Sequence, residues 1–348
     1  MRNWELARES IHIALCFTAT TLYNQLDLTT ASVLTVSIIT AYLLNEYARI
    51  KGLRTPLTRL YNRLLVGEEV KQLALSPIYL GAATLALMNL LPIGEASAAV
   101  VVAGLGDGFA GLLRTVKGER EKPSWRLKTA LAGFTLAALA ASLYVDPYCL
   151  PVTCLVAALM EMSLMRLDDN ISVPVTSGLL IHLSTSTGFN KTLREAVETT
   201  DATVYTFFKQ VPLTGLTGFL TTLDAVLPVL YLALAFSGLR EGRWRDSLKA
   251  VGLLATSTAL AQWAKVFFRK PRPPVSVKTG YSFPSNHAAL AGVSVGYYRK
   301  ARYLSALAYA LSIATVAEIL ILGNHWFSDV VAGFLIGLFI TLPIRELP

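Results

Sequence analysis

Long apolar segments follow one another along almost the entire chain, and they limit its possible folds more than any other feature. A helix of about 20 apolar residues crosses a bilayer, and polar breaks divide this sequence into about twelve such segments. In lipid, backbone polar groups must be hydrogen-bonded within the segment, which favours helices. The sequence therefore predicts an all-α, polytopic helical membrane protein. Its expected spans lie near residues 10–26, 29–46, 76–93, 96–113, 128–145, 149–165, 171–186, 212–237, 247–267, 286–299, 302–322 and 326–344.

The composition excludes an ordinary water-soluble enzyme. Hydrophobic residues make up 53% of the 348 residues and charged residues only 16%, whereas soluble domains carry about 25% charged residues. The net charge of +8 could indicate a nucleic-acid partner. In so apolar a chain, however, Lys and Arg are more typical of cytoplasmic loops and of sites for anionic groups, so we expect no nucleic acid. Cys16, Cys149 and Cys154 lack metal or disulfide spacing, and we expect them to pack in the core.

Clusters of basic residues predict how the chain is oriented in the membrane. With the spans above, four clusters fall on one side, near residues 47–63, 114–128, 240–249 and 299–302. The positive-inside rule makes this side cytoplasmic, and both termini then face the cytoplasm. One basic segment falls on the outer side and contains Lys265, Arg269, Lys270, Arg272 and Lys278. Positive charge placed against the topological bias indicates anion binding.

A polar stretch at residues 184–210 is the longest interior region without an expected span. We expect it to separate two membrane bundles and to contain an amphipathic surface helix around residues 193–209. The predicted domains are therefore residues 1–188 and residues 189–348.

Three motifs in the last part of the chain carry residues suited to phosphoryl transfer. In order, they are Lys265-x6-Arg272-Pro273, Pro284-Ser285-Asn286-His287 and His325-Trp326-Phe327-Ser328-Asp329. The cationic side chains can hold phosphate oxygens, and a neutral imidazole can act as nucleophile or as acid for the leaving group. His325 and Asp329 are four residues apart and share a helix face, so the carboxylate can orient the ring.

These motifs resemble those of the type 2 phosphatidic acid phosphatase (PAP2) family, over roughly residues 205–348. The family pattern is Lys-x6-Arg-Pro, then Pro-Ser-Gly-His, then Ser-Arg-x5-His-x3-Asp. The resemblance implies that His325 is the nucleophile that becomes phosphohistidine, that Asp329 is its partner and that His287 protonates the leaving oxygen. It assigns phosphate binding to Lys265, Arg272, Ser285 and Asn286 and implies no metal or other cofactor for this half.

Two positions depart from that pattern. Asn286 stands where the family has Gly, and Glu318-Ile319 stand where it has Ser-Arg. Loss of a charged hydrogen-bond donor of this kind commonly costs ~2–4 kcal/mol of transition-state stabilisation. We expect a working site that is either weakly active or dependent on a replacement, such as Arg269, for the missing guanidinium.

The other polar residues have simpler interpretations. Lys270 and Lys278, like Arg269 by default, are expected to contact lipid headgroups at the membrane interface. Trp326 is typical of the aromatic belt at that interface. His182 matches no motif, and we expect it to be structural.

The first half contains charged residues that membrane spans do not require. The main ones are Glu5, Arg8 and His12 on one helix face, Asp107 within Gly104-Leu105-Gly106-Asp107-Gly108, and Glu161 before Asp168-Asp169-Asn170. Charges within spans are functional candidates by default. The expected topology brings Asp107 and Asp169 to the cytoplasmic side beside the basic loop 114–128. This suits a magnesium nucleotide, because Mg²⁺ binds one or two carboxylates together with phosphates.

This half resembles the CTP-dependent polyprenol kinases, which include dolichol kinase and phytol kinase, over roughly residues 1–186. The resemblance lies in Glu5-Leu6-Ala7-Arg8-Glu9-Ser10-Ile11-His12, Asn45-Glu46, Gly106-Asp107-Gly108-Phe109-Ala110, and Asp169-Asn170-Ile171-Ser172-Val173-Pro174 after Glu161. It implies a kinase site with Arg8, His12, Asp107, Gly108, Lys122, Glu161, Asp169 and Asn170, and CTP with Mg²⁺ at Asp107 and Asp169. Arg114 stands where the family has Gly, and its Lys-Ser-x-Glu-Gly segment is reduced to Lys122-Pro123-Ser124-Trp125.

Together, the motifs predict a bifunctional enzyme acting on isoprenoid lipid carriers. The N-terminal half would phosphorylate a polyprenol such as dolichol at the cytoplasmic face, and the C-terminal half would hydrolyse polyprenyl diphosphate or monophosphate at the outer face. One alternative is a PAP2-type phosphatase of glycerolipid phosphates, phosphatidate or phosphatidylglycerophosphate, with an inert kinase-like half. Another is a non-catalytic lipid-binding or transport protein. Cytidylyl transfer to a lipid phosphate is a further alternative for the N-terminal half.

Overall fold

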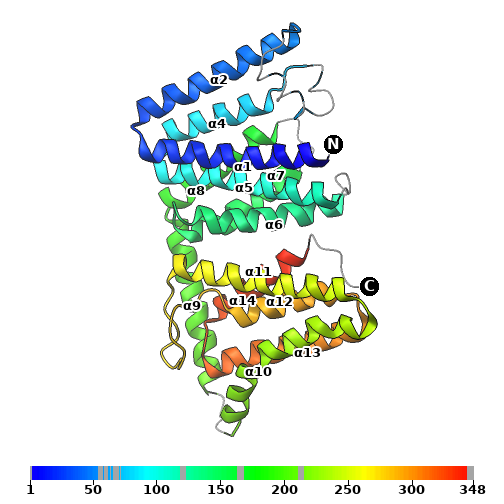
Figure 1. Cartoon of the computed structure of the whole chain (residues 1–348). Helices are drawn as coiled ribbons and strands as arrows, with labels where there is room; N and C mark the ends of the chain where they lie inside the picture. The colour runs from blue at the N-terminus through cyan, green and yellow to red at the C-terminus, as the bar shows by residue number, and fades with distance from the viewer. Residues whose placement is uncertain are drawn as a thin grey trace. The chain divides into compact units, whose positions relative to one another are not determined.

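The chain is helical throughout the residues that the computed structural model describes, which are 2–53, 58, 62, 64–65, 70, 72–117, 123–162, 168–210 and 215–342. Within these residues, helices alternate with turns and loops, including the long loop at residues 269–285, and there is no β-strand (Figure 1). The predicted all-α class is confirmed. The chain divides into two compact units, Met1–Asn190 and Lys191–Pro348, and each is described by itself.

The N-terminal unit is built around α5 (Ile93–Lys117). The most apolar part of this helix is 78% buried, and it packs against α1 (Arg2–Gln25), α6 (Pro123–Ala141) and α8 (Asp169–Ser186). Two glycines permit the close approach, because a Cβ at Gly104 would collide with α1 and a Cβ at Gly106 would collide with α6. The glycine-rich segment around Asp107 is therefore a packing surface within a continuous helix.

Three further helices belong to the described part of this unit. α7 (Leu150–Met162) follows the short 3₁₀ turn Pro147–Cys149 and packs against α6 and α8. α2 (Leu28–Ile50) packs on α4 (Ser76–Leu90), which in turn packs on α8. All three cysteines of the chain lie in this unit, and all three are buried free thiols, as the sequence predicts.

The C-terminal unit is built around α12 (Asn286–Tyr298). This helix packs against α11 (Trp244–Phe268), α13 (Arg302–Leu322) and α14 (Phe327–Thr341). The contact between α12 and α14 is the closest, because a Cβ at Gly292 or Gly337 would collide with backbone atoms of the partner helix. The core of the unit therefore depends on two helices whose backbones touch.

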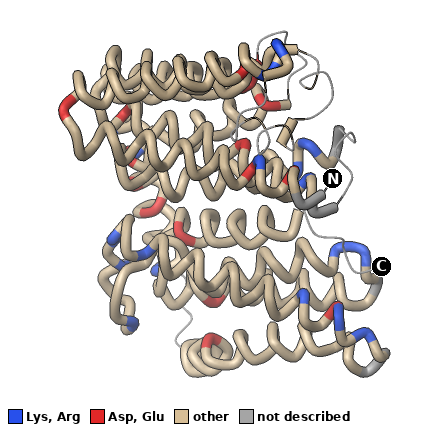
Figure 2. The backbone as a smooth tube through the Cα atoms, turned by 45° about the horizontal axis from the view of Figure 1, so that its top comes forward, with Lys and Arg blue, Asp and Glu red and all other residues tan. Residues whose placement is uncertain are grey.

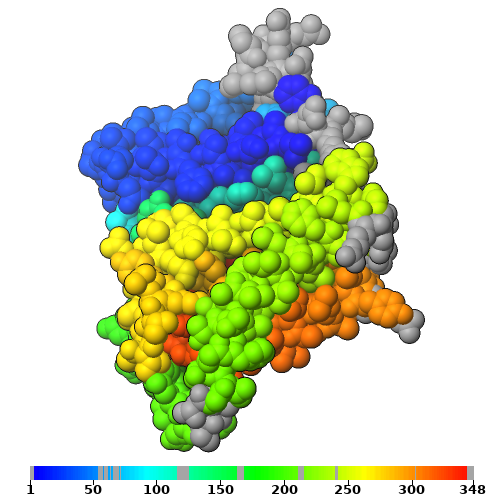
Figure 3. All heavy atoms as spheres, turned by 60° about the horizontal axis from the view of Figure 1, so that its bottom comes forward, coloured from blue at the N-terminus to red at the C-terminus, as the bar shows by residue number. Residues whose placement is uncertain are grey.

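Two more helices border this core. α9 (Phe189–Gln210) occupies the position of the predicted surface helix. α10 (Thr217–Phe236) is followed by the 3₁₀ turn Ser237–Glu241 and packs against α11 and α13. Figure 3 shows α10 and α11 side by side on one face of the unit. The outer side chains of α10 are large and apolar, which suits contact with lipid; the exposed ones are Phe219, Val226, Val229, Leu232 and Phe236.

Five of the described helices are long and apolar enough to cross a membrane unaided. They are Leu28–Ile50, Ile93–Thr115, Thr217–Leu239, Trp244–Phe268 and Tyr303–Leu322. Each predicted span coincides with a helix, but several are short. α12, for example, has 13 residues and is about 20 Å long, whereas the hydrocarbon layer is about 30 Å thick. The predicted count of about twelve spans therefore stays a prediction.

Substituting Gly337 by Ala tests the contact between α12 and α14. The added methyl group would meet the carbonyl oxygen of Ala289, and overpacking of this kind typically costs about 1–3 kcal/mol. We expect a clearly lower thermal unfolding midpoint in detergent. Gly252→Ala in α11 is the matched control, because a Cβ there meets nothing within 4 Å; it should be neutral or slightly stabilising. Equal midpoints for the two variants would contradict the close packing.

Candidate functional sites

The residues of the three C-terminal motifs meet at one end of the C-terminal unit. Lys265 lies near the end of α11, Ser285 caps the start of α12, and Asp329 lies in the first turn of α14. The Nζ atom of Lys265 donates to the carbonyl oxygens of Tyr281 and Ser282, each at 3.1 Å. The backbone N–H of Ser285 donates to the carbonyl oxygen of Asp329 at 2.9 Å. Motifs separated by as many as 60 residues in the sequence thus lie next to one another in the structure.

His325 is held between a cation and a carboxylate. Its Nε2 atom lies 3.2 Å from Nη1 of Arg272, and its Nδ1 atom lies 3.5 Å from Oδ2 of Asp329. A guanidinium can only donate hydrogen bonds, so Nε2 is the acceptor and the ring proton lies on Nδ1, facing the carboxylate. Burial is the main cause that lowers the pKa of His325 to about 4; Lys265 and Arg272 add to this, and Asp329 opposes it. The ring is therefore neutral at pH 7 and offers an unprotonated Nε2.

A network of charges holds Asp329 in place. Its Oδ2 accepts the backbone N–H of Trp326 at 2.9 Å, which completes the start of α14. Its Oδ1 lies 3.3 Å from Nζ of Lys270. The same Nζ lies 2.6 Å from Oδ2 of Asp201 and from Oγ of Ser328. Lys270 therefore belongs to this network, and its predicted role as a headgroup contact is wrong.

Asp201 is the residue of this network that the sequence did not reveal. It lies on α9, only 3% exposed, and its Oδ1 accepts the backbone N–H of Ser328 at 2.7 Å. Its Oδ2 accepts the hydroxyl of Ser328 at 2.7 Å. The helix predicted as an amphipathic surface element therefore caps α14 with a buried carboxylate. A lone Asp among threonines on a polar helix carries no signal that would have identified it.

Three further side chains near these motifs, those of Arg269, Lys278 and Trp326, bind partners that the sequence did not predict. Arg269 is exposed, and its Nε donates to the carbonyl oxygen of Val266 on its own helix, so it does not replace the missing guanidinium. Lys278 does not extend to a headgroup either, since its Nζ lies 2.6 Å from Oδ1 of Asp224. The indole N–H of Trp326 donates to the carbonyl oxygen of Pro271 at 2.8 Å. These contacts order the loop between α11 and α12.

His287 also has a carboxylate partner that the motifs do not contain. Its Nδ1 lies 3.2 Å from Oδ1 of Asp224, which comes from α10. Glu318, at the position where the family pattern has Ser, is fully buried on α13. Asn286 begins α12, and its Oδ1 is buried without a hydrogen-bond partner among the described residues, as is Nε of Arg272. A buried N–H without an acceptor is open to a ligand oxygen.

The comparison with known protein families finds a match in the C-terminal part of the chain. Residues 246–347 match the PAP2 superfamily. A PAP2 superfamily domain is present here. The match includes all three motifs and supports a phosphatase of lipid phosphates, but it begins after Asp201 and Asp224. No curated protein and no solved structure matches the chain.

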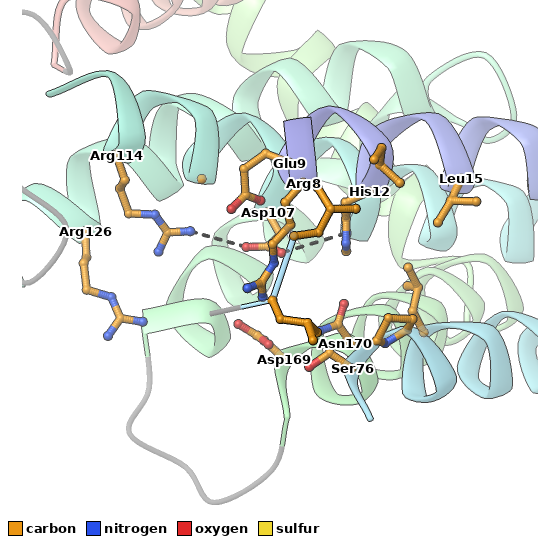
Figure 4. A pocket seen from close by; sticks show the side chains of 16 residues that line it. Arg8, Glu9, His12, Leu15, Ser76, Asp107, Arg114, Arg126, Asp169 and Asn170 are labelled. Carbon is orange, nitrogen blue, oxygen red and sulfur yellow. Dashed lines mark hydrogen bonds and ion pairs between the residues drawn. The ribbon is translucent and has the colours of Figure 1, made fainter. Parts of the chain in front are cut away.

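A pocket of about 360 Å³ opens in the N-terminal unit (Figure 4). Five of the residues predicted for a kinase site line it: Arg8, His12, Asp107, Asp169 and Asn170. Asp107 lies at its centre, with one carboxylate oxygen 3.9 Å from Nε2 of His12 and the other 3.4 Å from Nη2 of Arg114. These five residues come from three separate helices, α1, α5 and α8.

Three carboxylates converge beside this pocket. Oxygen atoms of Asp107, Glu161 and Asp169 lie within 4.8 Å of one another. Arg114 enters this cluster, with Nη1 2.5 Å from Oε1 of Glu161. Asp107 and Asp169 fit the predicted Mg²⁺ ligands in type, whereas Glu161 is engaged by the guanidinium. Arg126 lines the pocket and donates to the carbonyl oxygen of Glu161 at 3.1 Å.

Three other residues for which the sequence predicts a role in this half, Gly108, Lys122 and His182, do not line the pocket among the described residues. Gly108 lets α1 approach α5, since a Cβ there would collide with Ile13, so its role is packing. Lys122 lies outside the described residues. His182 pairs with Glu95, Nδ1 to Oε2 at 2.8 Å, which agrees with a structural role.

Replacing Asp201 by Asn tests the network around Asp329. The substitution keeps the shape but removes the charge that faces Lys270 and the start of α14. A hydrogen bond to a charged group contributes about 1.5–3 kcal/mol, so the unfolding midpoint in detergent should fall accordingly. Glu198→Gln removes a charge from an exposed position of the same helix and should leave the midpoint unchanged. A shift of equal size in both variants would contradict a specific role for Asp201.

The lowered pKa of His325 gives a spectroscopic prediction. In the folded protein the ring should stay neutral as the pH falls from 8 to 5 and take up a proton only near pH 4. Imidazole ¹⁵N shifts of the protein in detergent, assigned by their loss in His325→Gln, would report this. An unfolded histidine protonates near pH 6.5, so protons bind the unfolded state better and His325 should reduce stability progressively below about pH 6.5. Protonation of the folded ring near pH 6.5 would exclude the buried, neutral nucleophile.

Proposed function

We propose that the PAP2 domain hydrolyses polyprenyl diphosphate or monophosphate through a phosphohistidine at His325. The observation that carries this proposal is the setting of the His325 ring. Nε2 is unprotonated and lies beside a guanidinium, and Nδ1 faces the carboxylate of Asp329. This is the geometry that a histidine nucleophile needs, because the carboxylate stabilises the positive ring that forms when Nε2 bonds to phosphorus.

The proposed reaction has two steps. Nε2 of His325 attacks phosphorus while the bond from phosphorus to the leaving oxygen breaks, and His287 gives that oxygen its proton. A water molecule then attacks the phosphohistidine, His287 takes a proton from the water, and inorganic phosphate leaves. The buried Nε–H of Arg272 has no acceptor in the described part of the chain, and Lys265 has a third N–H beyond the two that bind carbonyl oxygens. Both can hold the equatorial phosphate oxygens during the transfer.

The choice of a polyprenyl substrate rests on the resemblance of the N-terminal half to polyprenol kinases. Glycerolipid phosphates remain the alternative, because the PAP2 match supports lipid phosphates as a class. We also propose that the phosphatase site faces the outer side, on the basis of the basic loops in the sequence. Parallel assays with polyprenyl diphosphate, phosphatidate and phosphatidylglycerophosphate distinguish the two substrate classes.

For the N-terminal unit, we propose CTP-dependent phosphorylation of a polyprenol. The supporting observation is the pocket that combines Asp107 and Asp169 with Arg8 and Arg126. Arginines can bind nucleotide phosphates, and Asp107 and Asp169 would hold Mg²⁺, which supplies positive charge to the transferred phosphate when bound. Arg114 already compensates Glu161, so this site would depend on two carboxylates.

A pair of histidine variants tests the phosphatase. His325→Ala should reduce phosphate release from polyprenyl diphosphate by at least about a thousandfold, because it removes the nucleophile. His182→Ala, which alters a histidine of the other unit, should retain the activity. Radiolabelled substrate should leave an acid-labile, alkali-stable label on the native chain and none on His325→Ala. Release that survives in His325→Ala would refute the phosphohistidine mechanism.

A separate assay tests the N-terminal unit. With CTP labelled in the γ-phosphate and a polyprenol in detergent, the native chain should produce labelled polyprenyl phosphate and CDP. Asp107→Asn should abolish this product, whereas Glu95→Gln, at the other end of the same helix, should not. Release of pyrophosphate in place of CDP would indicate cytidylyl transfer. Absence of both lipid phosphorylation and phosphate release would favour a non-catalytic lipid-binding protein.

A further inference from the structure

The carboxylate of Asp224 faces a ring nitrogen of His287 from a different helix. Nδ1 of His287, in the first turn of α12, lies 3.2 Å from Oδ1 of Asp224 on α10. Both side chains are mostly buried, with exposed fractions of 16% and 15%. Asp224 lies outside residues 246–347, which match the PAP2 superfamily, so none of the three motifs accounts for it. The proposed hydrolysis uses His287 but gives this carboxylate no role.

Lys278 holds the same carboxylate from a third direction. It belongs to the loop between α11 and α12, and its Nζ atom lies 2.6 Å from Oδ1 of Asp224. An ammonium at this distance stabilises the charged form of a carboxyl group. A carboxylate oxygen has two lone pairs, so Oδ1 can accept from the ammonium and from the imidazole together. The loop, α10 and α12 therefore fix the Asp224 side chain relative to His287.

Glu318 of α13 also lies near His287, but its surroundings differ. One of its oxygen atoms lies within 4.8 Å of both Asp224 and His287. The side chain is 0% exposed, and among the described residues neither of its oxygens has a hydrogen-bond partner. A proton on Glu318 removes the cost of burying a second negative charge beside Asp224. Asp224, which has the ammonium, is therefore the charged carboxylate available to a positive imidazole.

We propose that Asp224 is a positioning residue that orients His287 and stabilises its protonated ring during the hydrolysis. A carboxylate can only accept hydrogen bonds, so Nδ1 of His287 donates to Oδ1 and keeps its proton throughout. The other ring nitrogen, Nε2, is then the atom that exchanges a proton with the reactants. This inference rests on the proposed function, because it concerns the proton transfers that His287 makes there.

The carboxylate favours the form of His287 that acts first. In the first step the positive ring gives its Nε2 proton to the leaving oxygen as the bond from phosphorus to that oxygen breaks, and the ring becomes neutral. In the second step Nε2 takes a proton from the attacking water, and the ring is positive again. A fixed negative charge beside Nδ1 stabilises the positive ring at the start and at the end of this cycle.

Replacing Asp224 by Asn removes the charge but keeps the shape of the side chain. With a polyprenyl monophosphate, kcat for phosphate release should fall at least about tenfold, while KM should change less than about twofold. Asp246→Asn is the matched control, because Asp246 is also paired with a lysine of this unit, with Oδ1 2.9 Å from Nζ of Lys249. It should keep the native kcat. A native kcat in Asp224→Asn would overturn the proposal.

The substrate para-nitrophenyl phosphate separates a positioning role from a folding defect. Nitrophenolate is a stable anion and leaves without a proton, so its first turnover does not need His287 as an acid. Asp224→Asn should therefore release it in the first turnover at nearly the native rate, which also shows that the variant folds. An equal loss with both substrates would overturn the proposal.

Two further measurements do not depend on that substrate. The double variant Asp224→Asn/His287→Gln should be no slower than His287→Gln alone, because the carboxylate acts through this ring. Imidazole ¹⁵N shifts of the native chain, assigned by their loss in His287→Gln, should place the proton of the neutral ring on Nδ1. Additive losses in the double variant, or a proton on Nε2 of the neutral ring, would overturn the proposal.

His325→Ala distinguishes failure of this proposal from failure of the proposed function. Release lost in His325→Ala but unchanged in Asp224→Asn would overturn the role of Asp224 and leave the hydrolysis through His325 standing. Release that survives in His325→Ala would instead refute that hydrolysis.

Discussion

Placing ionised side chains among apolar helices is costly, and the arrangement of both units follows from how that cost is offset. In the N-terminal unit, Arg114 lies between the carboxylates of Asp107 and Glu161. In the C-terminal unit, Lys270 lies between those of Asp201 and Asp329. Charged residues gather mainly at helix ends, as Figure 2 shows. Each unit therefore joins its helices at one end through a cation shared by two acids.

This compensation is incomplete at two points of the C-terminal unit, and both are informative. Among the residues that the structure describes, Nε of Arg272 and both carboxylate oxygens of Glu318 are buried without a hydrogen-bond partner. An anion such as a phosphate oxygen corrects the first deficit, whereas a proton on the buried carboxyl is enough to correct the second. The apolar packing around α12 fixes the positions of both groups.

The sequence predicts much of the fold, because helix positions follow from long apolar runs, and these dominate the chain. It also predicts that the carboxylate of Asp329 faces the ring of His325 and that the three C-terminal motifs meet. The predicted shared helix face is wrong, because His325 lies in the loop before α14, which begins at Phe327. The sequence does not predict Asp201, Asp224 or the engagement of Lys270. These residues act through partners at least 54 positions away in the chain, and no local pattern encodes such pairing. Arg269 does not act as the proposed replacement, because its Nε donates to the carbonyl oxygen of Val266 on its own helix.

The carboxylate of Asp201 has a consequence for how this protein can be divided. Similarity to the PAP2 superfamily begins at residue 246. The hydrogen bonds from α9 to Ser328 and Lys270 begin 45 residues earlier. A fragment cut at the edge of the similarity would carry every recognisable motif but lose the side chain that caps α14. Transfer of this domain to another protein would therefore have to include α9, which lies outside the residues that match the family.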